Sequence, residues 1–136
     1  MRAALRIIAT IMGVGFTLQG IGFLVVPDQA VAGLGMPLLD GLGRSTQIGD
    51  FAAFFLTLGL SILAGSGPGH ARVLYFPAAL LASAAVCRTI AWAAQGADFA
   101  AAFIAVEAIG AGILLAAARQ PGRDVAHQAL QPAQNR

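Results

Sequence analysis

The chain has 136 residues, of which 58% are hydrophobic and only 10% are charged, and its mean hydropathy is +0.79. A soluble domain carries about 25% charged residues, so this chain has too few charged residues to form the hydrated surface of a soluble domain. The small net charge of +2 comes from arginines that flank apolar runs, which argues against a phosphate-binding surface for nucleic acid. The single cysteine, Cys87, excludes an internal disulfide and a cysteine-cluster metal site.

Four apolar stretches follow one another along the chain, each close to the roughly 20 residues that cross a hydrocarbon core of about 30 Å. They run over residues 7–26, 46–64, 73–94 and 99–118. Spanning segments must be helices or a closed barrel, because lipid offers the backbone no hydrogen-bond partners, and these runs lack the alternation of barrel strands. The sequence therefore predicts an all-α fold, an integral membrane four-helix bundle over residues 1–119. A polar cytoplasmic tail, expected to be mobile, follows over residues 120–136.

The arginines predict how the bundle is oriented. One side of the membrane would hold six of them: Arg2, Arg6, Arg72, Arg119, Arg123 and Arg136. The other side would hold Arg44 alone, beside Asp28, Asp40 and Asp98. Cytoplasmic loops carry the excess of positive residues, so both termini are predicted to be cytoplasmic. The absence of lysine and the abundance of alanine and glycine suggest a bacterial protein, and hence a multi-pass protein of the bacterial inner membrane.

Three ionisable side chains fall within the predicted spans: Asp50, Arg88 and Glu107. A charge at a helix centre costs about 2.5–3.5 kcal/mol, so such residues are usually paired or line a cavity. The third and fourth spans form an antiparallel hairpin whose turn lies midway between Arg88 and Glu107. Side chains lean toward the N-terminus of their helix, which brings these two to a similar depth. We expect a buried, bidentate ion pair between them.

The second span adds a polar stripe on one helical face, with Phe54 among its residues. Its polar members are Arg44, Gln47, Asp50, Thr57 and Ser61. The functional interpretation is a polar pocket in the outer half of the bundle. Its lining would be Gln47, Asp50, Arg88 and Glu107, with Arg44, Thr57 and Ser61 as secondary members. The structural interpretation is an ion-pair network that only fixes how the helices pack. The sequence leaves both interpretations open.

A stripe of small residues marks the fourth span. Its members are Ala101, Ala105, Ala108, Gly112 and Ala116. Small residues let helix backbones approach closely in membranes. The stripe is therefore predicted to pack inside the bundle, with homodimerisation as the alternative.

The order of these polar residues resembles a known pattern. Gly43-Arg44 leads through Gln47, Gly49 and Asp50 into the second span, and Arg72, Arg88, Gly96 and Glu107 follow. Over about residues 5–119 the chain resembles an uncharacterised bacterial family of four-span membrane proteins, domain of unknown function 4345, which is distantly similar to the DoxX proteins. The resemblance implies a four-helix membrane fold in which Arg88 and Glu107 match recurrent charged positions. It implies no activity.

The sequence favours a non-enzymatic protein with no catalytic residue, no cofactor and no metal site. It would bind a small-molecule or lipidic ligand, or act as an accessory subunit beside a membrane protein partner or as a homodimer. One alternative is a proton-coupled transporter working as an oligomer, although pairing with Arg88 would hold Glu107 in its charged form. The other alternative is a membrane enzyme that uses Glu107 or Asp50 as its acid or base, although no histidine lies at that depth.

Overall fold

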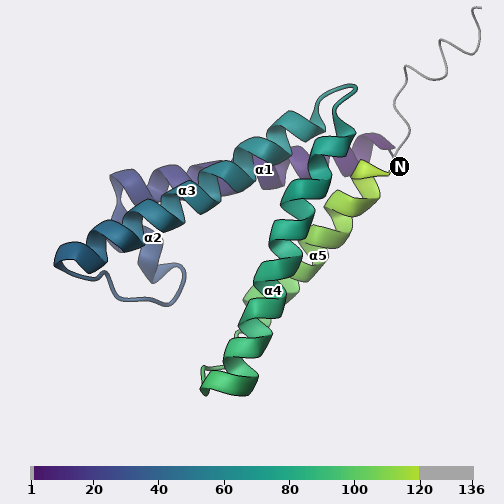
Figure 1. Cartoon of the computed structure of the whole chain (residues 1–136). Coiled ribbons are helices and arrows are strands. Elements are labelled where there is room, and N and C mark those ends of the chain that lie inside the picture. Colours follow the sequence, from purple (N-terminus) through teal and green to yellow (C-terminus); the bar gives the residue numbers. More distant parts are fainter. Residues whose placement is uncertain (1, 120–136) are drawn as a thin grey trace, which may run out of the picture.

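The computed structural model describes residues 2–119, which form helices joined by short loops (Figure 1). The elements are α1 (Arg2–Val25), α2 (Pro27–Ala32), α3 (Gly41–Ser66), the 3-10 helix η1 (Ala71–Leu74), α4 (Tyr75–Gln95) and α5 (Ala101–Ala118). No strand occurs between residues 2 and 119. The prediction of an all-α four-helix bundle is confirmed, and the predicted tail over residues 120–136 lies outside the described residues.

Within the described part of the chain, four helical segments are long and apolar enough to cross a membrane. Only 22% to 33% of each apolar window is buried inside the protein. Large apolar side chains such as Ile11, Val25 and Leu42 are 67%, 70% and 84% exposed. Apolar surface left in water costs about 25 cal/mol per Å², and a bilayer removes that cost. The chain is therefore a multi-pass membrane protein.

The helices extend beyond the predicted spans at several ends. Helix α1 begins at Arg2 rather than at residue 7, and α3 begins at Gly41 rather than at residue 46. The physical reason is that hydropathy marks only the part of a helix that suits hydrocarbon, whereas the helix itself continues into the polar interface. Helix α4 ends at Gln95, where Gly96 adopts a left-handed conformation with φ of 68°. Glycine takes this conformation without steric cost and commonly terminates helices.

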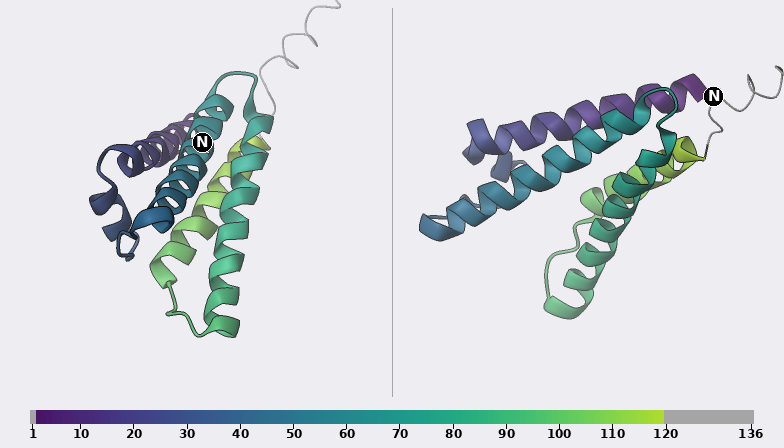
Figure 2. Two further views of the ribbon diagram at one scale, coloured as in Figure 1. Left: turned by 60° about the vertical axis from the view of Figure 1, so that its left-hand side comes forward. Right: turned by 45° about the horizontal axis from the view of Figure 1, so that its top comes forward.

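The four long helices form two hairpins, one of α1 and α3 and the other of α4 and α5. The hairpins meet at one end of the molecule, where α1 begins and α5 ends, and diverge toward the other (Figures 1 and 2). We call these the closed end and the open end. Helix α3 makes few contacts with α4, so the bundle is not evenly packed along its length. This divergence of the hairpins was not predicted from the sequence.

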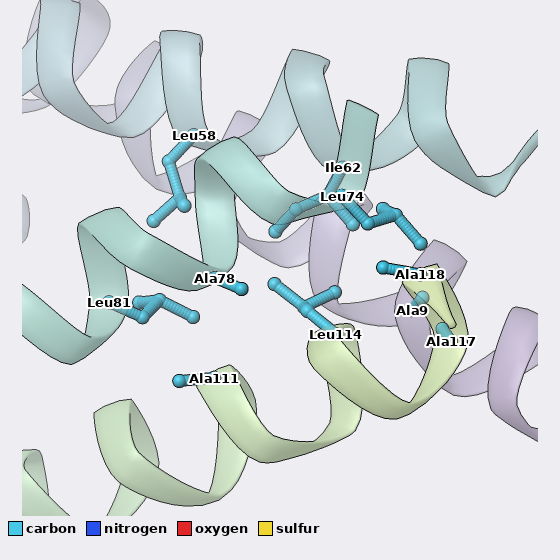
Figure 3. Packing of buried hydrophobic residues seen from close by; sticks show 10 residues of the cluster. All are labelled: Ala9, Leu58, Ile62, Leu74, Ala78, Leu81, Ala111, Leu114, Ala117 and Ala118. Atoms are coloured by element: carbon cyan, nitrogen blue, oxygen red, sulfur yellow. The ribbon is translucent and has the colours of Figure 1, made fainter. Parts of the chain in front are cut away.

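The closed end is held by a tightly packed core to which all four long helices and η1 contribute (Figure 3). Its large side chains, Leu58, Ile62, Leu74, Leu81 and Leu114, are at most 2% exposed. Alanines between them let the helices approach closely. This core is the main connection between the two hairpins.

The small-residue stripe of α5 faces away from this core, so the prediction that it packs inside the bundle is wrong. All five of its members, Ala101, Ala105, Ala108, Gly112 and Ala116, are exposed. The buried face of α5 instead carries Glu107, Gly110, Ala111, Leu114, Ala117 and Ala118. Both faces of this helix are apolar and rich in small residues, so hydropathy alone does not tell which of them meets protein.

Candidate functional site

Arg88 and Glu107 form an ion pair within the α4–α5 hairpin. Arg88 Nε donates a hydrogen bond of 2.8 Å to Glu107 Oε1. Arg88 lies seven residues before the end of α4, and Glu107 lies six residues after the start of α5. At about 1.5 Å per residue, both positions are about 10 Å from the turn that joins the helices. The expected contact is present, and the antiparallel register explains it.

The pair differs from the expectation in two respects. It is not bidentate, because Glu107 Oε2 is buried and has no hydrogen-bond partner among the described residues. It is not fully buried either, because the Arg88 side chain is 37% exposed whereas that of Glu107 is 12% exposed. The guanidinium lies over the ring of Phe103, 4.9 Å from its centroid. Arg88 thus has two contacts, a cation–π contact with Phe103 and a single hydrogen bond from Nε to the carboxylate.

A cavity of about 700 Å³ opens beside the ion pair. Residues of α1, α3, α4 and α5 line it, together with Leu34 from the loop after α2. It therefore lies between the two hairpins, where they diverge from the closed end. Small-molecule sites have volumes of about 300–1,000 Å³ and are mostly apolar with a few polar groups. The cavity has the size and character of such a site.

Five phenylalanines make up much of the cavity wall: Phe16, Phe51, Phe54, Phe55 and Phe103. Phe16 and Phe55 stack with centroids 6.1 Å apart, and Phe54 meets Phe55 edge-on at 5.2 Å. The polar groups in the lining are Gln19, Asp50, Arg88 and Glu107. The wall is thus mainly apolar and includes five aromatic rings, and its charged groups come from α3, α4 and α5.

Asp50 lines the same cavity as Arg88 and Glu107 but is exposed. Within the part of the chain that the structure describes, no ion pair joins Asp50 to Arg88. Asp50 belongs to the hairpin opposite the one that carries the pair, and the cavity lies between the hairpins. The structure therefore brings together three of the four predicted pocket residues around one cavity, without joining all of them in a network.

Gln47, the fourth predicted pocket residue, points elsewhere, and its assignment to the pocket is wrong. Its side chain is buried and holds the loop before α3: Oε1 accepts from the backbone N–H of Leu39, and Nε2 donates to the carbonyl of Pro37. A glutamine amide offers both a donor and an acceptor, so it can satisfy both backbone groups at once. Gln47 is a structural residue of this loop.

The three secondary candidates also lie away from the cavity. Arg44 pairs with Asp40 at 3.2 Å near the start of α3. Ser61 donates to the carbonyl of Leu58 in its own helix, and Thr57 is exposed. The stripe extends over several turns of α3, whereas the cavity meets only part of that helix. Of the stripe's residues, Asp50 and the apolar Phe54 line the cavity.

Gln19 and four of the phenylalanines were not predicted from the sequence as cavity residues. Gln19 is a polar residue in the middle of the first apolar stretch, a signal that could have drawn attention to it. Phe103 precedes Glu107 by four residues and so shares its helical face. The remaining aromatic positions carry no distinguishing signal, because phenylalanine is equally at home against lipid.

Fold and site together define an α-helical multi-pass membrane protein with a single-contact ion pair at the edge of an aromatic cavity. Comparisons with protein-family models, with curated proteins and with solved structures find no match to the chain. The function is therefore inferred from the site itself.

Proposed function

We propose that the protein binds a lipidic or small amphipathic molecule in the cavity between its hairpins and performs no chemistry on it. The observation that carries this proposal is the combination of an apolar wall with polar groups that lack full protein partners. Glu107 Oε2 has no donor, and Arg88 donates to protein only through Nε among the described residues. The pair joins α4 to α5, so it does not lock the two hairpins to each other. A purely structural role for the pair would leave both the cavity and these groups unexplained.

The transporter and enzyme hypotheses gain less support from this geometry. Glu107 Oε1 already accepts a hydrogen bond from Arg88 Nε within the α4–α5 hairpin, so one of the two carboxylate oxygens is occupied. The cavity lining contains no histidine or cysteine to act with Glu107 or Asp50. We also propose that the chain is related to the uncharacterised four-span family that it resembles, because Arg88 and Glu107 match the recurrent charged positions of that family.

The proposal includes an orientation in the bacterial inner membrane with the closed end in the cytoplasm. Arg6, Arg72 and Arg119 belong to the closed end, whereas Asp40 and Asp98 belong to the open end. Positive residues favour the cytoplasmic side. The cavity would then open toward the outer half of the bilayer.

Cysteine labelling tests this orientation. In a Cys87→Ser background, a cysteine at Asp40 is expected to react with a membrane-impermeant maleimide added to intact spheroplasts. A cysteine at Arg72 is expected to react only after the membrane is permeabilised. Both replaced residues are exposed, so a difference in labelling would reflect the side of the membrane and not burial within the protein. Equal labelling of the two positions from outside would contradict the orientation.

Filling the cavity tests the binding proposal. Gly15 lies in the cavity lining, and a Cβ atom added there meets no atom within 4 Å. Gly15→Leu is therefore expected to fold normally and to occupy the space of the ligand. A ligand in the cavity would then be forced against the new leucine side chain. Overpacking of this kind costs about 1–3 kcal/mol, so a ligand retained by the wild type should bind about tenfold more weakly or worse. Native mass spectrometry from mild detergent reports the bound molecule directly.

Gly112→Leu is the matched control. Gly112 is also an exposed helical glycine with open space around its added Cβ atom, but it lies outside the cavity. The control is expected to retain the molecule that the wild type carries. If Gly15→Leu retains it as well, or if the wild type carries nothing beyond bulk lipid, the binding proposal fails.

A further inference from the structure

The ion pair at the cavity presents two complementary hydrogen-bonding groups side by side. The terminal nitrogens of Arg88 have no protein acceptor within residues 2–119, and Glu107 Oε2 has no donor there. A guanidinium only donates, whereas a carboxylate only accepts. A group that satisfies both must therefore accept from Arg88 and donate to Glu107.

We infer, building on the proposed binding function, that the occupant is an uncharged lipid with a free hydroxyl group. A hydroxyl carries one donor and two acceptor lone pairs on a single oxygen. It can therefore accept from Arg88 while it donates to Glu107. The hydrocarbon part of such a lipid would lie against the phenylalanines of α1 and α3, across the cavity from the pair.

The charges around the cavity disfavour an anionic headgroup. One guanidinium and two carboxylates, those of Glu107 and Asp50, line the cavity, so the lining has a formal charge of −1. A phosphate or carboxylate headgroup would add a further negative charge in a region of low dielectric, where repulsion is strong. An ammonium headgroup has no acceptor for Arg88 and would face its positive charge. A neutral group with both functions satisfies the pair without adding charge to the lining.

The local geometry allows a ligand to reach the unpartnered oxygen. Oε2 is buried, but Glu107 lines the cavity and the last torsion of a glutamate is broad, so a small turn of the carboxylate can bring Oε2 toward a ligand. The guanidinium also lies over the ring of Phe103, a second contact that the carboxylate does not have. Glu107 is thus the residue that accepts a hydrogen bond from the ligand's hydroxyl group, and Arg88 is the residue that donates one to its oxygen.

A matched series of long-chain compounds tests this inference on the full chain. The series consists of hexadecanol, its methyl ether, hexadecylamine and hexadecyl phosphate, which share one hydrocarbon chain and differ only in the headgroup. Native mass spectrometry titrations give the affinity of each. A hydrogen bond to a charged group supports a preference of about tenfold or more for the alcohol over the ether. The amine and the phosphate are expected to bind more weakly than the alcohol.

Glu107→Gln provides the matching variant. The amide oxygen can still accept from Arg88 Nε, but the atom that replaces Oε2 becomes a donor. The preference for the alcohol over the methyl ether is expected to disappear, because the hydroxyl proton no longer has its acceptor. Retention of the full preference in this variant would overturn the role given to Glu107.

The outcomes separate this inference from the proposed function. If alcohol and ether bind the wild type equally and Gly15→Leu weakens the binding of both, the cavity binds apolar chains without recognising a hydroxyl group. Only the headgroup inference is then wrong. If the phosphate or the amine binds most tightly, the headgroup inference is likewise overturned. If no compound binds the wild type better than Gly15→Leu, the proposed function fails and the inference fails with it.

Discussion

Gly59→Ala is expected to be the most destabilising change in the first hairpin. A Cβ atom added at Gly59 would collide with Thr17 of α1 and would lie 2.7 Å from the backbone oxygen of Gly13. Thr17 itself is fixed by its hydrogen bond of 2.8 Å to the same oxygen. Because the added atom meets backbone, a side chain cannot move aside to relieve the contact, and the two helices have to separate.

The cost of this separation is expected to reach about 3 kcal/mol, the upper part of the range for overpacking. Thermal unfolding in detergent, followed by the loss of monodisperse protein, measures it. Gly112→Ala is the control, since its added Cβ atom meets nothing within 4 Å and alanine favours helix by about 1 kcal/mol over glycine. A Gly59→Ala protein as stable as this control would contradict the close approach of α1 and α3.

Arg88→Leu and Glu107→Leu are expected to destabilise the protein unequally and non-additively. Removing one partner of a buried pair leaves an uncompensated charge, at a cost of about 3–5 kcal/mol. Arg88→Leu should approach this cost, because the Glu107 side chain is only 12% exposed and would keep no partner among the described residues. Glu107→Leu should cost less, because Arg88 is 37% exposed and retains its contact with Phe103.

The double variant tests whether the stabilising effects of Arg88 and Glu107 depend on each other. Replacing both residues with leucine removes both charges, so much of the stability lost in Arg88→Leu is expected to return. Thermal unfolding of the four proteins under one set of conditions gives the coupling. Independent, additive effects of the two single changes would show that the residues do not depend on each other. A stable double variant that has also lost its bound molecule would place the pair in binding as well as in stability.

The sequence predicted the helices and the ion pair because both follow from counting residues. Span length and the position of the turn set the register of α4 against α5, and the register alone brings Arg88 beside Glu107. Details of that contact were not predictable, because the orientation of the guanidinium depends on its side-chain surroundings, which include the ring of Phe103. The backbone register says nothing about such a contact between side chains.

The arrangement of the hairpins could not be predicted for a different reason. In water, hydrophobic periodicity marks the face of a helix that meets protein, but in a bilayer the other face is apolar as well. On α5, the buried Gly110 and Ala111 and the exposed Ala105 and Ala108 are equally suited to either environment. The same ambiguity allowed Gln47 and Asp50, three residues apart, to be assigned to one pocket when one holds a loop and the other lines the cavity.

Photocrosslinking from inside the cavity tests the central claim, that a specific lipidic molecule lies between the hairpins. Benzoylphenylalanine would replace Phe54, which lines the cavity, and separately Phe76, which is 54% exposed and lies outside it. After irradiation in native membranes, the intact mass of the protein identifies each adduct. We predict one dominant adduct from position 54, distinct from the bulk phospholipids, and a mixture that follows the bulk lipid composition from position 76. The same bulk mixture from both positions, or crosslinks from position 54 only to α4 and α5, would contradict the account.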